Sequence, residues 1–250
     1  MADLIIVSDE AAVRTVRMNR PEKKNALTAV MYDAMAAAIE DYGRTASLRC
    51  LLIGGAPGAF CAGNDLNDFL AAAMGTGGLG KEVVRFLHAL PRCEKPLVAA
   101  VGGLAIGVGT TMLLHCDHVV ASSEAQLSTP FVGLGLLPEA ASSLLAPRRM
   151  GHTRAFSLLV MGRKLSATDA KDAGLVNTVV APGEVEAEAL KAAREIAALP
   201  AEAVAISRRL MRGAPDEIIA RMDEEVELYK QRIKSAEARA AFEAFLTRKR

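Results

Sequence analysis

The sequence predicts a mixed α/β core followed by a helical C-terminal region. Up to about residue 183, short apolar or alternating segments typical of strands are separated by turns and by segments with helical spacing. From Glu184 onward, apolar residues recur at helical intervals with acids and bases between them. We therefore expect a core over residues 1–183 and a helical region over residues 184–250. A chain of 250 residues is long enough to bury a core of this size.

The N-terminal half alternates strands with helices. Val13–Met18 alternates apolar and polar residues, which predicts a strand. Asn25 is placed to cap a helix that runs to a stop at Gly43. Cys50–Ile53 is a short apolar run and predicts a second strand. Helical spacing returns at Lys81–Leu90.

The most apolar part of the chain is Leu97–Leu114, 18 residues without a charge. This length reaches the lower limit for a membrane-spanning helix. The segment contains four glycines, however, and the pair Gly102-Gly103 is typical of a turn. We therefore expect a buried strand at Leu97–Val101, a turn and a buried helix, with no membrane partner. Two further strands are expected at His118–Ala121 and Val176–Val180.

The C-terminal region has three clear helical segments. Ala201–Arg212 and Ala236–Leu246 both have helical spacing. Between them, a further helix is marked by the apolar residues Ile218, Met222, Val226, Tyr229 and Ile233.

Charge and motifs argue against several classes of function. Thirty Lys and Arg against 29 Asp and Glu leave a net charge of +1, with no basic patch for nucleic acid. The chain has no nucleophile elbow, no phosphate-binding P-loop and no dinucleotide-binding fingerprint. His115 and His118 are three residues apart, but a metal site needs further ligands at fixed spacing. We therefore expect no metal and no nucleic-acid partner.

The termini and the cysteines predict a cytoplasmic protein. An early Asp3, with no apolar stretch and cleavage site after it, argues against a signal peptide. The C-terminal Arg248-Lys249-Arg250 is not a peroxisomal tripeptide. The four cysteines have no paired spacing, which indicates free thiols in a reducing compartment.

Two segments, Phe60–Leu66 and Gly102–Gly109, have small residues at a strand-to-helix turn, which leaves backbone N–H groups open. Two such turns facing one another can direct two N–H donors at a single oxygen, as an oxyanion hole requires. Taken alone, each segment is better explained by tight helix–strand packing. A third feature is needed to decide between these interpretations.

That feature is Glu139, which follows Pro138 and is flanked by two leucines and two alanines. Periodicity alone favours a surface acid at a helix start. The apolar neighbours also fit a desolvated base with a raised pKa, suited to removing a weakly acidic proton. Asp65 lies near a first turn as well, where capping a helix is the simpler role.

Together these segments resemble the enoyl-CoA hydratase/isomerase (crotonase) superfamily over nearly the whole chain. Asn19–Leu27 is similar to the family's first block, near the CoA, Phe60–Leu66 to its second and Lys95–Asp117 to its third. The resemblance implies the crotonase (ClpP-like) α/β fold, a spiral of β-β-α units with a C-terminal helical region that assembles as a homotrimer or a dimer of trimers. It also implies an acyl-CoA substrate, held at its thioester oxygen by the backbone N–H groups of Asn64 and Val108.

Carboxylates distinguish the branches of this family. Hydratases use two glutamates to hold and activate water, and the corresponding positions here are Thr111 and Phe131. Neither side chain can act as a general acid or base for hydration.

The segments Cys61–Leu66, Ser128–Phe131 and Leu137–Ser143 are instead similar to the peroxisomal-type 3,2-enoyl-CoA isomerase branch. The resemblance implies that Glu139 is the catalytic base of that reaction, in which an enolate forms on the way from 3-enoyl-CoA to 2-enoyl-CoA. Ala140 is a departure, because that branch usually has glycine there.

The resemblance implies no cofactor other than the CoA of the substrate, and it places the protein in fatty acid metabolism. It further implies that substrate and CoA are bound by Lys23, Lys24, Ala26, Ala62, Gly63, Asp65, Leu66, Gly107, Phe131 and Pro138. Residues 74–80 are expected to border the acyl pocket.

Three alternatives remain open. One is another crotonase activity on an acyl-CoA thioester, including hydration. Another is a non-catalytic acyl-CoA binder or an RNA-binding relative. A purely structural oligomer leaves Pro138-Glu139 and the two glycine-rich turns unexplained.

Overall fold

The structure, a computed structural model, describes residues 3–65 and 80–248. Within these residues the larger sheet has six strands in the order β1-β2-β3-β4-β6-β9. The hairpin of β1 (Ile5–Glu10) and β2 (Val13–Met18) is antiparallel, and every other pair in this sheet is parallel. The parallel strands are β3 (Cys50–Gly55), β4 (Leu97–Val101), β6 (His118–Ser122) and β9 (Thr178–Val180).

The expected strands of this sheet are confirmed, with small changes of boundary. β3 extends two residues beyond the expected end, and β9 begins two residues later than expected. β1 is an additional strand that we did not expect. A smaller sheet, also not expected, contains β5 (Leu104–Ile106), β7 (Gln126–Ser128) and β8 (Leu165–Ser166).

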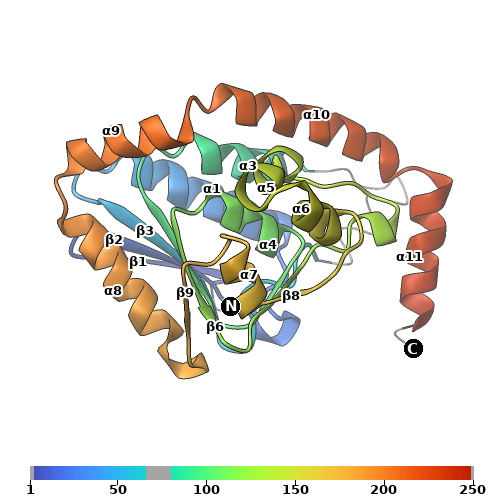
Figure 1. The fold of residues 1–250 in the computed structure, drawn as a ribbon, viewed down its shortest axis with the longest axis horizontal. Coiled ribbons are helices and arrows are strands. Elements are labelled where there is room, and N and C mark those ends of the chain that lie inside the picture. Colours follow the sequence, from blue (N-terminus) through green and yellow to red (C-terminus); the bar gives the residue numbers. More distant parts are fainter. Residues whose placement is uncertain (1–2, 66–79, 249–250) are drawn as a thin grey trace.

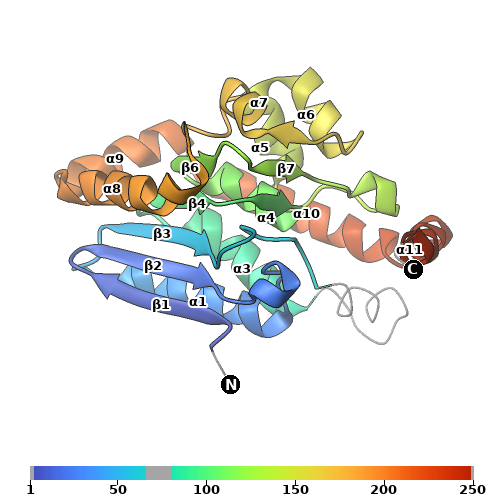
Figure 2. The same ribbon diagram turned by 90° about the horizontal axis from the view of Figure 1, so that it is seen from below.

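Helices cover both faces of the larger sheet. The buried strands carry apolar side chains on both faces, as parallel strands usually do. In β3, Leu51 and Ile53 belong to the core shared with α1 (Ala29–Arg44) and α3 (Lys81–Arg92). Leu52 faces the other way, toward α8 (Val185–Ala198). Figure 2 shows α1 and α8 on opposite sides of the strands.

The expected helical C-terminal region is confirmed. After α8 come α9 (Ala201–Arg212), α10 (Asp216–Arg232) and α11 (Ala236–Arg248), and Figure 1 shows α9 and α10 following one another along one side of the molecule. α8 packs on the sheet of the core, although it follows the expected domain boundary at residue 183. The remaining helices are η1 (Pro21–Lys23), α4 (Val108–Thr111), η2 (Met112–His115), η3 (Val132–Leu134), α5 (Ser142–Met150), α6 (His152–Leu159), α7 (Ala167–Asp172) and η4 (Pro182–Glu184).

The predicted capping role of Asn25 is wrong. The N-cap of α1 is Thr28, whose side chain accepts a hydrogen bond from the backbone N–H of Met31. Asn25 is instead fully buried at a positive φ of 56°, and its side-chain amide donates to the carbonyl oxygens of Ala56 and Ala59. Asn25 therefore ties the loop after β2 to the loop after β3. The helix also continues past the expected stop and ends at Arg44.

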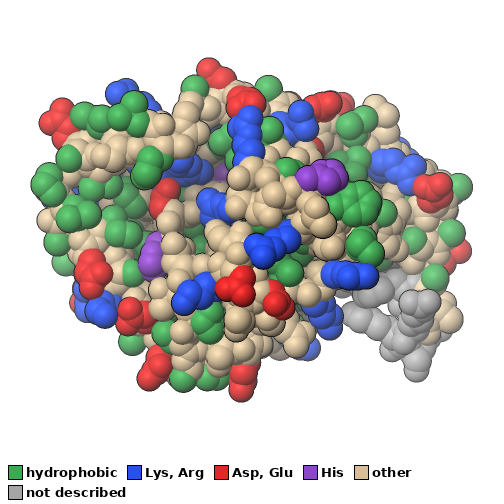
Figure 3. Space-filling view, in the orientation of Figure 1, with side chains coloured by type: hydrophobic (Ala, Val, Ile, Leu, Met, Phe, Trp, Pro, Cys, Tyr) green, Lys and Arg blue, Asp and Glu red, His purple; other side chains and the backbone are tan. Residues whose placement is uncertain are grey.

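The uncharged segment at residues 97–114 forms β4, β5, α4 and part of η2. No helix in the described ranges is both long and apolar enough to cross a membrane. All four cysteines are buried free thiols. On the face seen in Figure 3, basic and acidic side chains are interspersed. The helix expected to follow the turn at Phe60–Leu66 falls on residues 66–79, outside the described residues.

Candidate active site

The two glycine-rich segments lie side by side. The backbone N–H of Cys61 donates to the carbonyl oxygen of Leu104 (3.0 Å), and that of Ile106 donates to the carbonyl oxygen of Cys61 (2.8 Å). Glycine makes this approach possible, because a Cβ atom on Gly63 would lie 3.0 Å from the carbonyl oxygen of Ile106. A Cβ atom on Gly109 would lie 2.6 Å from that of Cys61. The two turns therefore meet backbone to backbone.

Each turn leaves a backbone N–H open. Asn64 lies opposite Leu27 in a parallel β-bridge, whose two hydrogen bonds are made by the carbonyl oxygen of Gly63 and the N–H of Asp65. The N–H of Asn64 itself is therefore directed away from Leu27. Val108 is the first residue of α4, and the first N–H groups of a helix have no intrahelical acceptor. Neither N–H donates a hydrogen bond within the described part of the chain. These are the two amides that the family resemblance implied as donors to the thioester oxygen.

Glu139 lies in the loop between η3 and α5 and is only 4% exposed. Its Oε1 atom is buried and has no hydrogen-bond partner in the part of the chain that the structure describes. Burial, and to a smaller extent the nearby charge of Glu225, raise the pKa of this carboxyl to about 8. Glu139 is therefore not the surface acid that periodicity favoured.

Electrostatic interactions connect Glu139 to the first glycine-rich segment. Burial and, to a smaller extent, the charge of Glu139 raise the pKa of the Cys61 thiol to about 12 and that of Tyr32 well above its usual value. The hydroxyl of Tyr32 donates a hydrogen bond to Oδ1 of Asn64. The charge of Glu139 is thus felt by Cys61, which lies in the first glycine-rich segment, and by Tyr32, which is hydrogen-bonded to Asn64 of that segment.

A hydrogen bond connects the Glu139 loop to the second segment. His115 ends η2, the helix that continues α4, and its ring Nε2 lies 2.8 Å from the carbonyl oxygen of Ala140. Burial lowers the pKa of His115 to about 3, so the ring is neutral and its Nε2–H donates this bond. Within the described ranges, no three His, Cys, Asp or Glu side chains are grouped to hold a metal ion.

The expected CoA-binding segments also meet. The backbone N–H of Ala62 donates to the carbonyl oxygen of Lys24 (3.0 Å), which joins the loop at residues 23–26 to the first glycine-rich segment. The side chains of Lys23 and Lys24 are exposed, and Ala26 is half-buried. Asp65 is buried and accepts a hydrogen bond from Arg20 (2.6 Å), so its carboxylate is engaged in an ion pair.

Of the other expected site residues, some lie in the described part of the chain and some do not. Gly107 has a positive φ of 57°, and its open side faces the ring of Phe131. Pro138 is half-buried directly before Glu139. Leu66 and residues 74–79 of the expected acyl-pocket border lie outside the described residues.

The two positions expected to carry acids in a hydratase are buried and uncharged. Thr111 is fully buried in α4, and its hydroxyl oxygen has no hydrogen-bond partner among the described residues. Phe131 is 6% exposed. Neither side chain can hold a water by accepting its proton.

Sequence reasoning missed Glu225 and Tyr32. Glu225 is 5% exposed and lies on the apolar face of α10, between Met222 and Tyr229. An acid among the apolar residues that mark the buried face of a helix could have been recognised from the sequence as a candidate buried acid. Tyr32 gave no comparable signal, because an aromatic residue on the buried face of α1 is ordinary core.

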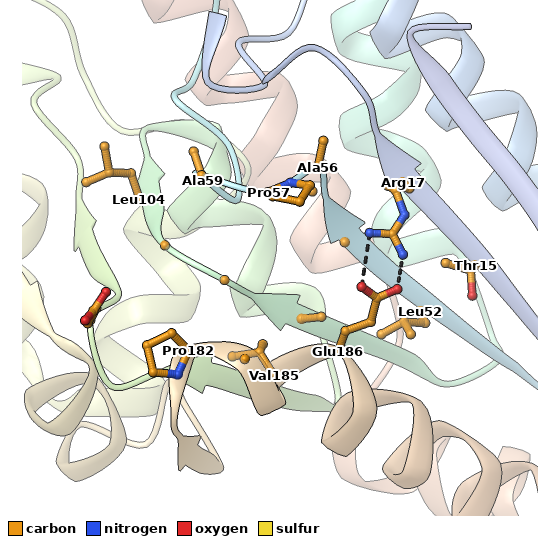
Figure 4. A pocket seen from close by; sticks show the side chains of 18 residues that line it. Thr15, Arg17, Leu52, Ala56, Pro57, Ala59, Leu104, Pro182, Val185 and Glu186 are labelled. Carbon is orange, nitrogen blue, oxygen red and sulfur yellow. Dashed lines mark hydrogen bonds and ion pairs between the residues drawn. The ribbon is translucent and has the colours of Figure 1, made fainter. Parts of the chain in front are cut away.

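A separate cavity of about 600 Å³ lies between the ends of β2 and β3 and the start of α8 (Figure 4). Arg17 reaches across it and pairs with Glu186. None of the expected site residues lines this cavity, and its arginine is already paired. It is therefore distinct from the region around Glu139.

Comparisons with known proteins agree on one family. The family model described as enoyl-CoA hydratase/isomerase matches residues 8–250. The chain is 32% identical to the 1,2-epoxyphenylacetyl-CoA isomerase of Escherichia coli, over all of this chain and 97% of that protein. It is 35% identical to the enoyl-CoA delta isomerase 2 of Rattus norvegicus, over 98% of this chain but only 64% of that longer protein.

Solved structures give the same result. The crystal structure of an enoyl-CoA hydratase/isomerase from Pseudoalteromonas atlantica superposes with a TM-score of 0.93. The two sequences are 41% identical, and the match covers 98% of each chain.

Proposed function

Because the chain belongs to the enoyl-CoA hydratase/isomerase (crotonase) family, we propose that it is an acyl-CoA isomerase that converts 3-enoyl-CoA to 2-enoyl-CoA. The observation that carries this proposal is the environment of Glu139. Its carboxyl is buried, has a pKa raised to about 8 and keeps an oxygen with no hydrogen-bond partner among residues 3–65 and 80–248. A desolvated carboxylate of this kind is a strong base for a weakly acidic C–H.

The first step of the proposed reaction is removal of a proton from C2 of the substrate by the Glu139 carboxylate. The C2–H electrons form a C1–C2 double bond, and negative charge develops on the thioester oxygen. The open N–H groups of Asn64 and Val108 donate to that oxygen and stabilise the enolate more than the ground state. Each such donor typically contributes about a hundred- to a thousandfold in rate.

The second step returns the proton at C4. Electrons move from the enolate through C2 and C3, the C3–C4 double bond becomes a C2–C3 double bond, and Glu139 is restored as a carboxylate. One residue thus serves as base and then as acid, and among the described residues Glu139 is a buried acid with an unpartnered oxygen. Hydration needs a second group to activate water, and Thr111 and Phe131 are unsuited to that role.

The test is a spectrophotometric assay with 3-enoyl-CoA substrates of several chain lengths, in which conjugation of the product is followed. Glu139→Gln keeps the shape of the side chain and removes its basicity, so we expect kcat to fall by at least about a hundredfold with CoA-ester binding retained. Glu124→Gln, which changes an exposed acid, is the control. Full activity of Glu139→Gln would reject the assignment.

A second candidate is isomerisation of 1,2-epoxyphenylacetyl-CoA. It is favoured by the full-length match to the E. coli enzyme of that name. The same enzyme preparation, given each substrate in turn, distinguishes the two candidates. Formation of a 3-hydroxyacyl product from 2-enoyl-CoA would instead indicate hydratase activity.

The CoA moiety is proposed to bind along the loop of Lys23, Lys24 and Ala26 and the segment of Ala62, Gly63 and Asp65. The two exposed lysines are available to CoA phosphates, whereas Asp65 supports the loop through Arg20. We expect the double variant Lys23→Ala/Lys24→Ala to raise KM with little change in kcat. An unchanged KM would remove the lysines from the site.

The C-terminal helical region is proposed to form a homotrimer, or a dimer of trimers, of the 26.4 kDa chain. α9 exposes apolar side chains, among them Leu210 (75% exposed) and Met211 (82% exposed). Such residues on one helix are typical of a subunit contact. Sedimentation equilibrium measures the mass, and a monomer at micromolar concentration would contradict the proposal.

A further inference from the structure

The loop that carries Glu139 is held by a second buried acid from a distant helix. One carboxylate oxygen of Glu225, on α10, accepts the backbone N–H of Ala141 (2.6 Å). The other accepts the backbone N–H of Ser143 (3.1 Å) and its hydroxyl (2.5 Å). Glu225 therefore accepts the N–H groups at the start of α5, as the side chain of an N-cap residue usually does. It lies 84 positions after Ala141 and 82 positions after Ser143 in the sequence.

This loop needs an external hold because its backbone is strained. Ala140 and Ala141 both have positive φ values, 62° and 52°, which residues with a Cβ rarely adopt. Ala141 is also the N-cap of α5, but its side chain has no acceptor to offer. His115 fixes the carbonyl of Ala140, and Glu225 fixes the N–H of Ala141. The two contacts together determine the direction in which Glu139 leaves the backbone.

We propose that Glu225 is a positioning residue for the reaction, which keeps Glu139 aimed at the substrate through the N–H groups of Ala141 and Ser143. The inference rests on the proposed function, since it takes Glu139 as the base. Glu225 itself touches no reacting atom. It acts by fixing the loop and by adding a second negative charge near the base.

The charges around the two acids support this role. Glu139 and Glu225 are both buried, and the charge of Glu225 raises the pKa of Glu139. Burial also raises the pKa of Glu225, to about 7, although its three donors and Arg221 favour the charged form. The other titratable groups in the described ranges whose pKa the charge of Glu139 affects are Tyr32, Tyr229 and Cys61, none of which is a cation. His115, which contacts the same loop, is neutral because burial lowers its pKa to about 3.

The test compares Glu225→Gln with Glu227→Gln. Both variants remove one negative charge from α10, but Glu227 is exposed and pairs with Lys230. A glutamine at residue 225 has one acceptor oxygen, so its NH₂ group must face one of the two backbone donors. We expect kcat of Glu225→Gln to fall between about ten- and a hundredfold, because small misplacements of a catalytic group have effects of that size. KM should change little.

Two further measurements separate positioning from a general loss of structure. The pH at which kcat/KM reaches half its maximum should move to lower pH in Glu225→Gln, because Glu139 loses a neighbouring negative charge. Backbone amides of residues 139–150 should exchange hydrogen faster, with the exchange of the sheet unchanged. Glu227→Gln should match the parent protein in all three measurements.

Ser143→Ala is the second variant, for use where Glu225→Gln does not fold. It removes one donor to Glu225 and keeps both charges, so kcat should fall by a smaller factor with no acid shift of the pH profile. Parent-like kcat, pH profile and exchange in Glu225→Gln would overturn the inference, and so would a parent-like kcat in Ser143→Ala if only that variant folds. If Glu139→Gln is fully active, the proposed function fails, while faster exchange of residues 139–150 in Glu225→Gln would still establish the hold on the loop.

Discussion

Gly109 and Cys61 pack backbone against backbone, so closely that a Cβ atom on Gly109 would lie 2.6 Å from the carbonyl oxygen of Cys61. It would also lie 2.9 Å from the Cβ atom of Cys61. Real side chains do not approach this closely, so Gly109→Ala must push the two turns apart. We expect a loss of about 1–3 kcal/mol in unfolding free energy, as for other overpacked sites. Because Val108 precedes Gly109, kcat should also fall by at least about tenfold.

Gly102→Ala is the matched control for this prediction. Gly102 belongs to the same glycine-rich segment, but a Cβ atom there would have no neighbour within 4 Å. Its unfolding free energy should stay within about 0.5 kcal/mol of the parent. Urea unfolding and the isomerase assay measure both effects. Equal stability of the two variants would mean that the close approach of the turns does not constrain them.

The pH dependence of activity follows from the raised pKa of Glu139. The base must be ionised to take a proton, and burial raises its pKa to about 8. We therefore expect kcat/KM to rise about tenfold per pH unit below pH 8 and to level off above it. The profile is measured with a 3-enoyl-CoA substrate from pH 5.5 to 9.5. A flat profile between pH 6 and 8 would mean that Glu139 is ionised throughout, contrary to this environment.

The same carboxyl should make the protein less stable as the pH rises. An ordinary glutamate has a pKa of 4.5, and in the folded protein that of Glu139 is about 8. The folded state therefore binds this proton more tightly, so the stabilisation is complete below pH 4.5 and is lost as the pH rises toward 8. Glu139→Gln should remove this loss and reduce the difference in unfolding free energy between pH 5 and 9 by roughly 1–4 kcal/mol.

Urea unfolding of the parent and Glu139→Gln at both pH values measures this effect. Because the charges of Glu139 and Glu225 interact, the comparison measures the pH dependence that the Glu139 carboxyl adds, including its effect on Glu225. A variant whose stability changes with pH as steeply as the parent would place the titration elsewhere. Together with the pH profile of activity, the result tests whether the buried Glu139 carboxyl lowers the stability of the folded protein while it supplies the base for the reaction.

Periodicity predicted the fold well because the core strands and C-terminal helices are local patterns. The strand at Val13–Met18 and the helix at Ala201–Arg212 have the expected boundaries. Local reasoning failed at Asn25, a residue type that often caps helices. Its side chain instead donates to carbonyl oxygens more than 30 positions away. No sequence window contains such a contact.

In the candidate site, too, local sequence patterns predicted some features and missed others. The glycine-rich turns suggested two segments with open backbone N–H groups, because backbone geometry there depends on neighbouring residues, and the family resemblance pointed to Asn64 and Val108 within them. The burial of Glu139 could not be derived from periodicity, which favoured the surface. In the fold, the carboxyl lies close enough to Tyr32 and Tyr229, from two helices distant in the sequence, for its charge to raise their pKa values. The resemblance to a family supplied what the local pattern lacked.

Ala140 provides the final prediction, since its positive φ of 62° is strained for a residue with a Cβ atom. Such a conformation costs about 1–2 kcal/mol per residue. Ala140→Gly removes that strain but orders a more flexible residue, at a cost of about 0.5–1 kcal/mol. We therefore expect its unfolding free energy to be unchanged or up to about 1.5 kcal/mol higher, with kcat retained.

Ala140→Val should have the opposite effect. A β-branched residue is disfavoured at positive φ, and Ala140 is 1% exposed, which leaves little room for added atoms. We expect a loss of about 2 kcal/mol or more in unfolding free energy, and a lower kcat because Glu139 is the adjacent residue. Urea unfolding and the isomerase assay compare the two variants. If valine were tolerated as well as glycine, the loop could adopt another backbone conformation without harm, and the hold exerted by His115 and Glu225 would have no catalytic consequence.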